Sequence, residues 1–532
     1  MRMGYEMRSV FLALVFVGLL QAWADEPGLS SSQIRVQTII DSSGTLSRPS
    51  NLLGTLEGSL PLEEEVPATG ALMEDSLLYP DSVWRHYYYV LPGSYDHSRP
   101  NPMVVWLHGG VSTEELASYD ETVLEDWPLI PDMLDAGYVI VLPCAQLGAT
   151  WWDENGQLGV LEIVREMKGR LNVDDSRVFV GGFSDGASGS WALMMLYPSP
   201  FAGYMAFSGH LGVASLDGSR ETYLPSLSNR PGLATHSDMD GLYPISRMEP
   251  TVDLALAAGA DLEYSTFYGY EHDPAYLREF VDDVICFLDT TQRERFPDSV
   301  VWKAGEPSRC DWLCVDSIIP WPLVGEDFEY NTVLVSDRLM FGFYPDYEYE
   351  GEGVRISAVV DGDLPATRMG FQSGDVIVSF QGSEVSDLEE LYELEEGLRA
   401  GDPFSLSILR NGDRLDIEDR FNPPEYYWLL SRSAPAVRVE AVRRGNTFEL
   451  DVNRLCRLGL LLHPGMVDLD EDVVVLCNGR EVYRGRVEQS GELIVGSFLR
   501  SFDRSRIWSA RLELNLEESL MPLMAPDRPV RM

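Results

Sequence analysis

Positively charged side chains are scarce in this sequence of 532 residues, since 40 Lys and Arg stand against 85 Asp and Glu. The net charge of −45 opposes binding to nucleic acid and to anionic lipid, because contacts to phosphate groups require Lys and Arg. The acidity is not arranged in a calcium-loop pattern, and Cys and His pairs with the spacing of zinc ligands are absent. We therefore expect a well-hydrated acidic surface, no metal site and no nucleic-acid partner.

Cysteine is also rare, with 6 residues, which excludes the dense disulfide framework of a small secreted scaffold. For Cys144 and Cys286, which lie in apolar stretches, we expect buried free thiols. Cys310 and Cys314 stand four residues apart in strand-like sequence, about 13 Å, which is too far for a disulfide. Cys456 and Cys477 could meet across neighbouring strands, and the pairing of the cysteines stays open.

Long apolar runs are missing beyond the N-terminus. The run Val10–Leu20 follows Arg8 and precedes Ala22-Trp23-Ala24, which is the arrangement of a signal peptide cleaved after Ala24. It is shorter than the ~20 residues of a membrane-spanning helix, and an uncleaved anchor is the alternative. We expect residues 1–24 to be removed, the mature chain to have no membrane insertion, and the protein to be secreted or periplasmic.

The rest of the chain changes character twice. Residues 25–80 carry few long periodic segments and predict a loosely structured lead-in. From 81 to 295, short apolar runs alternate with helical patterns, which is typical of an α/β fold with a doubly wound, mainly parallel sheet. The β-rich remainder divides into 296–335, 336–421 and 435–520. Because a few strands alone are marginally stable, we expect the outer two segments to form one β-sandwich-like domain, into which the middle segment is inserted.

The strongest chemical signal is Gly182-Phe183-Ser184-Asp185-Gly186, between a predicted strand and a predicted helix. This is the context that a Gly-x-Ser-x-Gly nucleophile turn requires, because only small neighbours permit the strained serine. A serine nucleophile needs a base and the base needs an acid, in the chain order Asp then His. Asp240 and His272 follow later predicted strands in that order, and Asp238 is the alternative acid.

Attack on a carbonyl also requires donors for the developing oxyanion. The N–H groups of Asp185 and Gly110 are the candidates, since Gly110 belongs to a His-Gly-Gly loop after a predicted strand. Trp151 and Trp152 follow another predicted strand and are candidates for the substrate pocket, with core or lid packing as the alternative.

Residues from about Tyr87 to Leu288 resemble exported α/β-hydrolase esterases related to polyhydroxybutyrate depolymerases, feruloyl esterases and the carboxylesterase/phospholipase group. The resemblance rests on 105–109, 175–184, 240–244 and His272. It implies an acyl-serine intermediate, no cofactor and a small-molecule or polymer ester substrate. Asp185 departs from the family, in which a small, amide or Met residue follows the serine. A carboxylate there is expected to slow attack or to repel acidic substrates.

Residues 336–421 resemble a PDZ domain of the bacterial type, through 354–360, 364–366, 369–371 and 373–377. The peptide-binding loop of that family corresponds to Met340-Phe341-Gly342-Phe343. The resemblance therefore makes Phe341, Gly342 and Phe343 candidates for binding the terminal carboxylate of a peptide or protein partner.

Three functions stay open at this point. An exported serine carboxylesterase is the first prediction. A serine peptidase of the same fold is the second, because a PDZ domain often accompanies proteolysis. A non-catalytic scaffold that retains the hydrolase fold is the third, and the complete set of Ser184, Asp240 and His272 argues against it.

Overall fold

The structure is a computed structural model that describes residues 49–59, 68–218, 221–319, 332–336, 339–346, 349, 351–360, 362–395, 397–430 and 436–516. The predicted signal peptide and the first half of the predicted lead-in lie outside these residues. The chain divides into two compact units, Asn331–Leu430 and the remainder. None of the helices in the described segments is long and apolar enough to cross a membrane.

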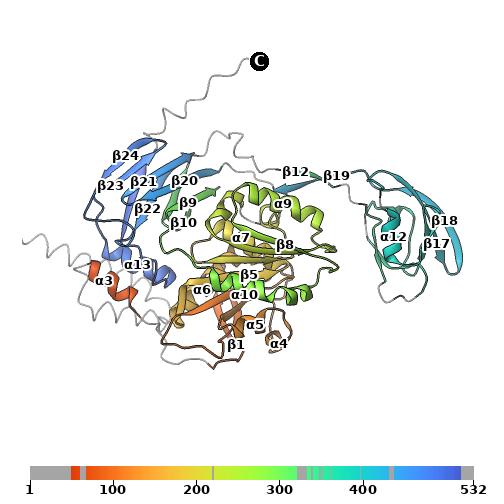
Figure 1. Ribbon diagram of the computed structural model, residues 1–532, viewed down its shortest axis with the longest axis horizontal. Helices are drawn as coiled ribbons and strands as arrows, with labels where there is room; N and C mark the ends of the chain where they lie inside the picture. The colour runs from red at the N-terminus through yellow and green to blue at the C-terminus, as the bar shows by residue number, and fades with distance from the viewer. Residues whose placement is uncertain are drawn as a thin grey trace, which may run out of the picture. The chain divides into compact units, whose positions relative to one another are not determined.

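The larger unit contains an eight-stranded sheet with the order β1-β2-β4-β3-β5-β6-β7-β8 (Figure 1). β1 and β2 are antiparallel, and the neighbours from β4 to β8 in this order are parallel. The strands are β1 (Met73–Leu78), β2 (Trp84–Val90), β3 (Asn101–Leu107), β4 (Val139–Pro143), β5 (Val173–Phe183), β6 (Gly203–Phe207), β7 (Gly232–Ser237) and β8 (Leu262–Phe267). Every residue of β4, β6 and β7 is buried, as expected of strands covered on both faces.

Helices cover both faces of this sheet because successive side chains of each strand point to opposite sides. Val104 and Trp106 of β3 share a core with α5 (Ile130–Asp135) and α10 (Val281–Thr290). Leu107, one position on, lies against α7 (Asp185–Leu196) on the other face. The other helical segments here are α4 (Val123–Asp126), α6 (Glu154–Arg170), α8 (Val213–Leu216), η1 (Leu224–Asn229), α9 (Ile245–Ala257) and η2 (Pro274–Glu279).

Two further sheets of the larger unit enclose a second core. One has the order β24-β23-β21-β20-β9 and the other β10-β11-β22-β25. The strands are β9 (Ser299–Ala304), β10 (Ser308–Cys310), β11 (Leu313–Ile318), β20 (Val437–Arg444), β21 (Thr447–Asn453), β22 (Leu455–Leu462), β23 (Val473–Cys477), β24 (Arg480–Gly485) and β25 (Ala510–Asn515). Because β9 pairs with β20 and β11 with β22, the segments on either side of the smaller unit share both sheets.

The smaller unit has its own sheet and core. Its strands are β13 (Phe343–Pro345), β14 (Val354–Val359), β15 (Val376–Phe380), β16 (Ser383–Glu384), β17 (Pro403–Arg410) and β18 (Asp413–Arg420), its helices are α11 (Pro365–Arg368) and α12 (Leu388–Glu395), and β12 (Thr332–Ser336) pairs with β19 (Glu425–Leu430). The β17–β18 hairpin turns at Asn411 and Gly412, both with positive φ, as the Asn-Gly signal predicts.

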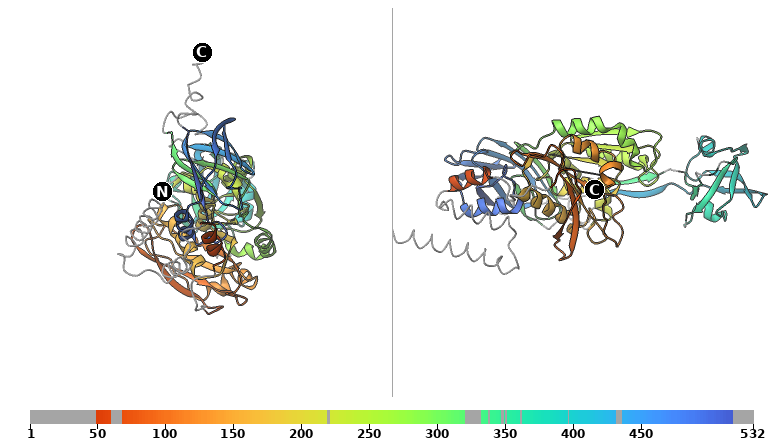
Figure 2. Two further views of the ribbon diagram at one scale, coloured as in Figure 1. Left: turned by 90° about the vertical axis from the view of Figure 1, so that its left-hand side faces the viewer. Right: turned by 90° about the horizontal axis from the view of Figure 1, so that it is seen from below.

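The predicted lead-in is more ordered than the sequence suggests. β1 lies inside residues 25–80 yet forms the edge of the eight-stranded sheet. α3 (Pro49–Glu57) buries Leu52, Leu53 and Leu56 against α13 (Gly491–Ser501), and Figure 2 shows these two helices side by side. A helix of nine residues is marginal in isolation, so its stability comes from a partner more than 430 residues away in the chain. The local pattern of apolar residues in 49–57 gives no indication of this distant partner helix.

Two expectations about cysteine are wrong. Cys286 is exposed, because its position on α10 faces away from the sheet that the same helix covers with Val284 and Phe287. Cys456 and Cys477 form no disulfide with each other, because they lie on β22 and β23, which belong to different sheets. Cys310 and Cys314 are free, as expected, but the reason given was wrong, since they lie on the paired strands β10 and β11 and not along one strand. The buried Cys144 is also free, as expected.

Candidate active site

The turn between β5 and α7 holds Ser184 in a strained conformation. Its φ is +59°, a region that non-glycine residues rarely adopt. The two neighbouring glycines have no room for a side chain, since a Cβ on Gly182 or Gly186 would lie 2.5 or 1.9 Å from the Leu107 carbonyl oxygen. The Ser184 N–H donates to the carbonyl of Phe207, at 2.9 Å, and so anchors the turn to β6. The Gly-x-Ser-x-Gly motif therefore forms the sharp strand-to-helix turn that its sequence predicts.

Three side chains from separate loops form one hydrogen-bonded chain. His272 Nε2 lies 2.8 Å from Ser184 Oγ, and His272 Nδ1 lies 2.7 Å from Asp240 Oδ2. A carboxylate only accepts, so Nδ1 carries the proton and Nε2 is free to accept from the serine hydroxyl. Asp240 is buried, and its other oxygen accepts from the N–H groups of Leu242 and Tyr243 at 2.9 and 2.8 Å.

Asp238, the alternative acid, is engaged elsewhere. Its Oδ1 accepts from the Gly269 N–H at 2.7 Å, so it links the loop after β7 to the loop after β8. The carboxylate that is hydrogen-bonded to His272 is thus that of Asp240 and not that of Asp238.

The loop after β3 lies directly against the serine. A Cβ on Gly109 would be 3.0 Å from the Ser184 Cβ, so this position must stay small. Among the described residues, the N–H groups of Gly110 and Asp185 donate no hydrogen bond. Both candidate oxyanion donors are therefore available to a ligand.

His108 and Trp151 support this loop from behind. His108 Nε2 accepts from the Ala145 N–H at 3.0 Å, so its Nδ1 carries the proton and donates to the Gly109 carbonyl at 2.7 Å. Burial lowers the pKa of His108, which favours this neutral form. The Trp151 indole N–H donates to the His108 carbonyl at 2.8 Å, and its ring packs against Gly189. Trp151 and Trp152 are both buried, which favours core packing over the predicted pocket role.

The Asp185 carboxylate makes two contacts that the sequence did not suggest. One oxygen accepts from the Val111 N–H at 3.1 Å, and the other accepts from the Tyr243 hydroxyl at 2.8 Å. Val111 follows Gly110 in the loop after β3, and Tyr243 lies with Asp240 in the loop after β7. The side chain thus ties both loops to the start of α7, and its charge is partly satisfied by these donors. Burial and the Asp185 charge together raise the pKa of Tyr243, which stays protonated and donating.

Replacing this carboxylate tests its positioning role. Asp185→Ala removes both contacts but keeps the backbone N–H, so we expect kcat to fall about tenfold to a hundredfold with KM little changed, because misplaced donors act mainly on the transition state. Asp185→Asn retains an acceptor and should lose less than Asp185→Ala. Steady-state kinetics of both variants and of Tyr243→Phe measures this. Equal loss in Asp185→Asn and Asp185→Ala would show that the charge itself matters.

Two more buried histidines surround the site. Burial lowers the pKa of His210 to about 4 and also lowers the pKa of His236. The His210 ring stacks on Tyr243, with centroids 6.5 Å apart, and its Nδ1 accepts from the Gly212 N–H at 2.9 Å. The His236 Nε2–H donates to the Tyr243 carbonyl. Both rings are therefore neutral parts of the core beside the loop that carries Asp240.

A neutral buried histidine makes stability depend on pH. Between the ordinary pKa of about 6.5 and the folded-state pKa of about 4, His210 binds a proton in the unfolded protein but stays neutral in the folded one. The contribution of neutral His210 to the free energy of unfolding is therefore complete above pH 6.5 and is lost as the pH falls toward 4. The expected loss is about 3 kcal/mol. Denaturant unfolding at pH 7 and pH 4.5 measures it. His210→Gln, which cannot titrate, should flatten this dependence, and an unchanged slope would assign it to other groups.

The predicted peptide loop lies in the smaller unit. Phe341 is buried and packs its ring against Phe380, Phe404 and Phe421, so its side chain serves the core. Gly342 has a φ of +88°, and a Cβ there would lie 2.6 Å from Leu364. Phe343 begins β13, an edge strand. The loop geometry therefore follows from its glycine, and the open edge beside it is the feature that a peptide strand would use.

Comparison with known proteins identifies both parts. Residues 159–292 match the phospholipase/carboxylesterase family, and residues 333–418 match the PDZ domain. The chain carries an α/β-hydrolase domain and a PDZ domain. Both predicted resemblances, and the predicted fold class with its C-terminal strand-rich sheets, are confirmed.

Individual relatives cover only part of the chain. A solved thermostable esterase is 18% identical over 42% of this chain and 63% of its own, with a TM-score of 0.35. The fluorophosphonate-binding serine hydrolase F of Staphylococcus aureus is 15% identical over 42% of this chain and 99% of its own, with a TM-score of 0.34. A Hahella chejuensis protein named "Probable periplasmic serine endoprotease DegP-like" is 37% identical over 12% of this chain. The matches span 32% and 14% of the curated relatives' own lengths.

Proposed function

We propose that this protein is an exported serine hydrolase that cleaves a carboxylic ester through an acyl-serine intermediate. The observation that carries the proposal is the chain of hydrogen bonds from Asp240 through His272 to Ser184, at 2.7 and 2.8 Å. The serine follows β5, the aspartate follows β7 and the histidine follows β8, so all three lie at the carboxyl ends of parallel strands. The match to the phospholipase/carboxylesterase family supports ester hydrolysis.

Each residue has a role in this mechanism. His272 Nε2 takes the hydroxyl proton while Ser184 Oγ attacks the ester carbonyl, and buried Asp240 stabilises the imidazolium that forms. The N–H groups of Gly110 and Asp185 bind the developing oxyanion. The proton then passes from His272 to the leaving alcohol, which leaves the acyl group on Ser184. Water, activated by the same imidazole, releases the acid.

The rim of the site supports a substrate with an apolar part. Large apolar side chains are exposed in the loops after β4, β7 and β8, namely Leu147, Met239, Leu242 and Tyr268. Met239 and Leu242 flank Asp240, and Leu242 is 70% exposed. Exposed apolar residues gathered at one end of a sheet are typical of a binding surface, since burying them on a ligand is favourable.

Activity on paired substrates tests the proposal. The purified protein should hydrolyse short-chain p-nitrophenyl esters at least a hundredfold faster than peptide p-nitroanilides, and a fluorophosphonate probe should label it at Ser184. Faster cleavage of the anilides would assign a peptidase instead. Absence of both labelling and turnover would leave a non-catalytic scaffold.

A weak peptide site in the PDZ domain is a further expectation. The residues on either side of β13 form hydrogen bonds with the β14 segment. The Gly342 carbonyl accepts from the Val360 N–H at 2.9 Å, and the Asp346 N–H donates to the Arg355 carbonyl at 2.7 Å. Hydrogen bonding alternates along a strand, so Phe343 and residue 345 face the open edge. Residue 345 is proline and has no N–H.

Restoring this donor should strengthen binding. We expect Pro345→Val in the full chain to bind C-terminal peptides about fivefold more tightly than the native protein, which corresponds to one hydrogen bond of about 1 kcal/mol. Fluorescence anisotropy with a C-terminal peptide library measures this, and amidated peptides serve as controls. Micromolar binding by the native chain, with no gain in Pro345→Val, would contradict the expectation.

A further inference from the structure

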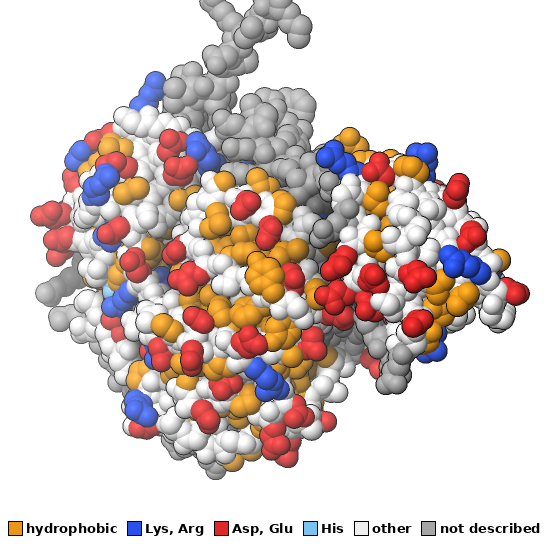
Figure 3. Space-filling model, turned by 45° about the vertical axis from the view of Figure 1, so that its right-hand side comes forward, with side chains coloured by type: hydrophobic (Ala, Val, Ile, Leu, Met, Phe, Trp, Pro, Cys, Tyr) orange, Lys and Arg blue, Asp and Glu red, His pale blue; other side chains and the backbone are white. Residues whose placement is uncertain are grey.

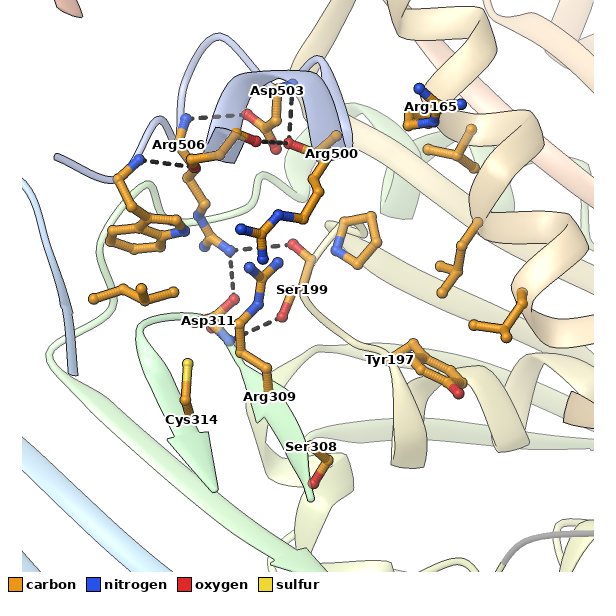
Figure 4. A pocket seen from close by; sticks show the side chains of 18 of the residues that line it. Arg165, Tyr197, Ser199, Ser308, Arg309, Asp311, Cys314, Arg500, Asp503 and Arg506 are labelled. Atoms are coloured by element: carbon orange, nitrogen blue, oxygen red, sulfur yellow. Dashed lines mark hydrogen bonds and ion pairs between the residues drawn. The ribbon is translucent and has the colours of Figure 1, made fainter. Parts of the chain in front are cut away.

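A cavity of about 720 Å³ lies in the larger unit, apart from the catalytic residues. α6 of the hydrolase domain contributes part of its lining, and β10, β11 and α13 of the strand-rich region contribute much of the rest (Figure 4). Ser184, Asp240 and His272 are not among its lining residues. The cavity is therefore a second place where a ligand could bind.

Its charge is opposite to that of the protein. Cationic side chains outnumber acidic ones in the lining, whereas the whole chain carries a net charge of −45. Acidic side chains are scattered over the face shown in Figure 3, and Lys and Arg are fewer there. Arginines that lie close together repel one another, which is unfavourable unless acidic side chains or a bound anion compensate their charges.

Ion pairs inside the protein explain the deeper cations. Arg293 and Lys168 lie 2.7 and 3.2 Å from Asp503, and Arg506 pairs with Asp311. All five side chains are buried. These groups hold the strand-rich region against the hydrolase domain, and their charges are compensated within the fold.

Arg309 of β10 and Arg500 of α13 are different. Both are exposed at the cavity, and neither forms an ion pair with any residue that the structure describes. Arg500 only donates from Nε to the Gly496 carbonyl of its own helix, at 3.2 Å. In Figure 4 the side chain of Arg500 reaches down from α13 and that of Arg309 reaches up from β10, so that their guanidinium groups lie next to each other.

The thiol of Cys314 gives a second measure of this convergence. Burial raises the pKa of Cys314, and the charges of Arg309, Arg511 and Arg500 oppose that rise. All three guanidinium groups therefore lie close enough to the Cys314 thiol in the cavity wall to lower its pKa. Arg511 is already bound to Asp316, at 2.7 and 2.8 Å, which leaves the charges of Arg309 and Arg500 uncompensated.

The rest of the cavity offers apolar surface. Leu158 and Leu161, one turn apart on α6, and Leu493, two turns before Arg500 on α13, all line it and are only half-buried. Residues three, four or seven apart share one helix face. α6 therefore presents Leu158 and Leu161 on one side, and α13 presents Leu493 and Arg500 on one side. The volume also exceeds what an inorganic anion fills, since pockets for organic ligands measure roughly 300–1,000 Å³.

We propose that this cavity binds an organic phosphate, with its doubly charged head between Arg309 and Arg500 and its apolar body against Leu158, Leu161 and Leu493. Two guanidinium forks match the charge and the tetrahedral oxygens of a phosphate monoester. The leucines add the burial of apolar surface that inorganic phosphate lacks. This binding site is independent of ester hydrolysis at Ser184.

Calorimetry with phenyl phosphate, inorganic phosphate and phenol tests the proposal on the full mature chain. Phenyl phosphate should bind one to one, inorganic phosphate at least tenfold more weakly, and phenol without measurable heat. Arg309→Gln and Arg500→Gln should each weaken phenyl phosphate at least tenfold, and the double variant should abolish binding. Raising the salt concentration should weaken binding as well, since screening acts on exposed charges.

Matched variants separate the site from general charge effects. Arg484→Gln removes an exposed arginine of β24 that pairs with Glu481 outside the cavity, and it should bind like the native protein. Ser184→Ala should also bind normally, so loss of esterase activity does not bear on this site. Unchanged binding in the Arg309→Gln/Arg500→Gln double variant, or equal affinity for phenyl phosphate and inorganic phosphate, would overturn the proposal. Thermal unfolding of each variant shows that the fold is kept.

Discussion

Ser184→Ala is expected to lower the turnover of a carboxylic ester by about four to six powers of ten without unfolding the protein. The triad acts as a unit, so the loss of the nucleophile leaves only the binding and oxyanion contributions. His272→Ala should cost about as much, because the hydroxyl that lies 2.8 Å from Nε2 then has no base. Steady-state kinetics, with circular dichroism as the folding check, measures both.

Matched variants make this expectation specific. Ser190→Ala removes another hydroxyl of α7, one that is buried and donates only to the Gly186 carbonyl at 2.9 Å, and it should keep its activity and its fluorophosphonate labelling. Asp240→Asn should lose nearly as much turnover as His272→Ala, since the histidine then loses its charged partner. Asp238→Asn should lose little. A larger effect at Asp238 than at Asp240 would contradict the assignment of the acid.

The sequence was sufficient to predict the part of the site that depends on local context. The turn at Ser184 is recognisable because its glycines, its strand and its helix are contiguous in the chain. Asp240 and His272 could be placed because parallel strands bring the loops after their carboxyl ends to one edge of a sheet. Chain order and strand ends were therefore enough to bring three distant residues together.

The contacts made by Asp185 could not be predicted in the same way. Its sequence position suggested a bare carboxylate beside the oxyanion donors, but its partners are the Val111 N–H, 74 residues earlier, and the Tyr243 hydroxyl, 58 residues later. Side-chain direction at a helix start depends on the packing of loops that carry no periodic signal. Trp151 was ambiguous for a related reason, because an indole donor can face a ligand or a carbonyl of the fold.

The strand-rich region shows a second limit of sequence. Alternating patterns identified its strands but not which sheet each strand joins, so Cys456 and Cys477 were placed on neighbours when they lie in separate sheets. The helix α3 was missed because nine residues carry a weak signal and their apolar face is completed by α13. Long-range pairing decides both cases.

The same long-range packing produces an ion cluster on which stability should depend. Asp311 is 1% exposed, and one of its oxygens binds both Arg230, at 2.5 Å, and Arg506. Burial acts to raise the pKa of Asp311, but the charges of Arg230 and Arg506 outweigh it and hold the pKa well below its usual range. The Asp311 N–H also donates to Ser199 of the hydrolase domain, at 2.8 Å. This aspartate therefore joins the strand-rich region to the hydrolase domain.

Asp311→Asn is expected to destabilise the larger unit by about 3–5 kcal/mol, because it leaves two buried guanidinium charges without a counter-charge. Asparagine keeps the size of the side chain and tolerates the positive φ of +50° at this position, so the backbone is not strained by the change. The shift of the denaturant midpoint, followed by tryptophan fluorescence, measures the effect. Asp298→Asn is the control, since Asp298 pairs with Arg443 but is 75% exposed, and surface pairs contribute about 0–1 kcal/mol. If Asp311→Asn shifts the midpoint no more than Asp298→Asn does, the buried cluster does not hold the two domains together.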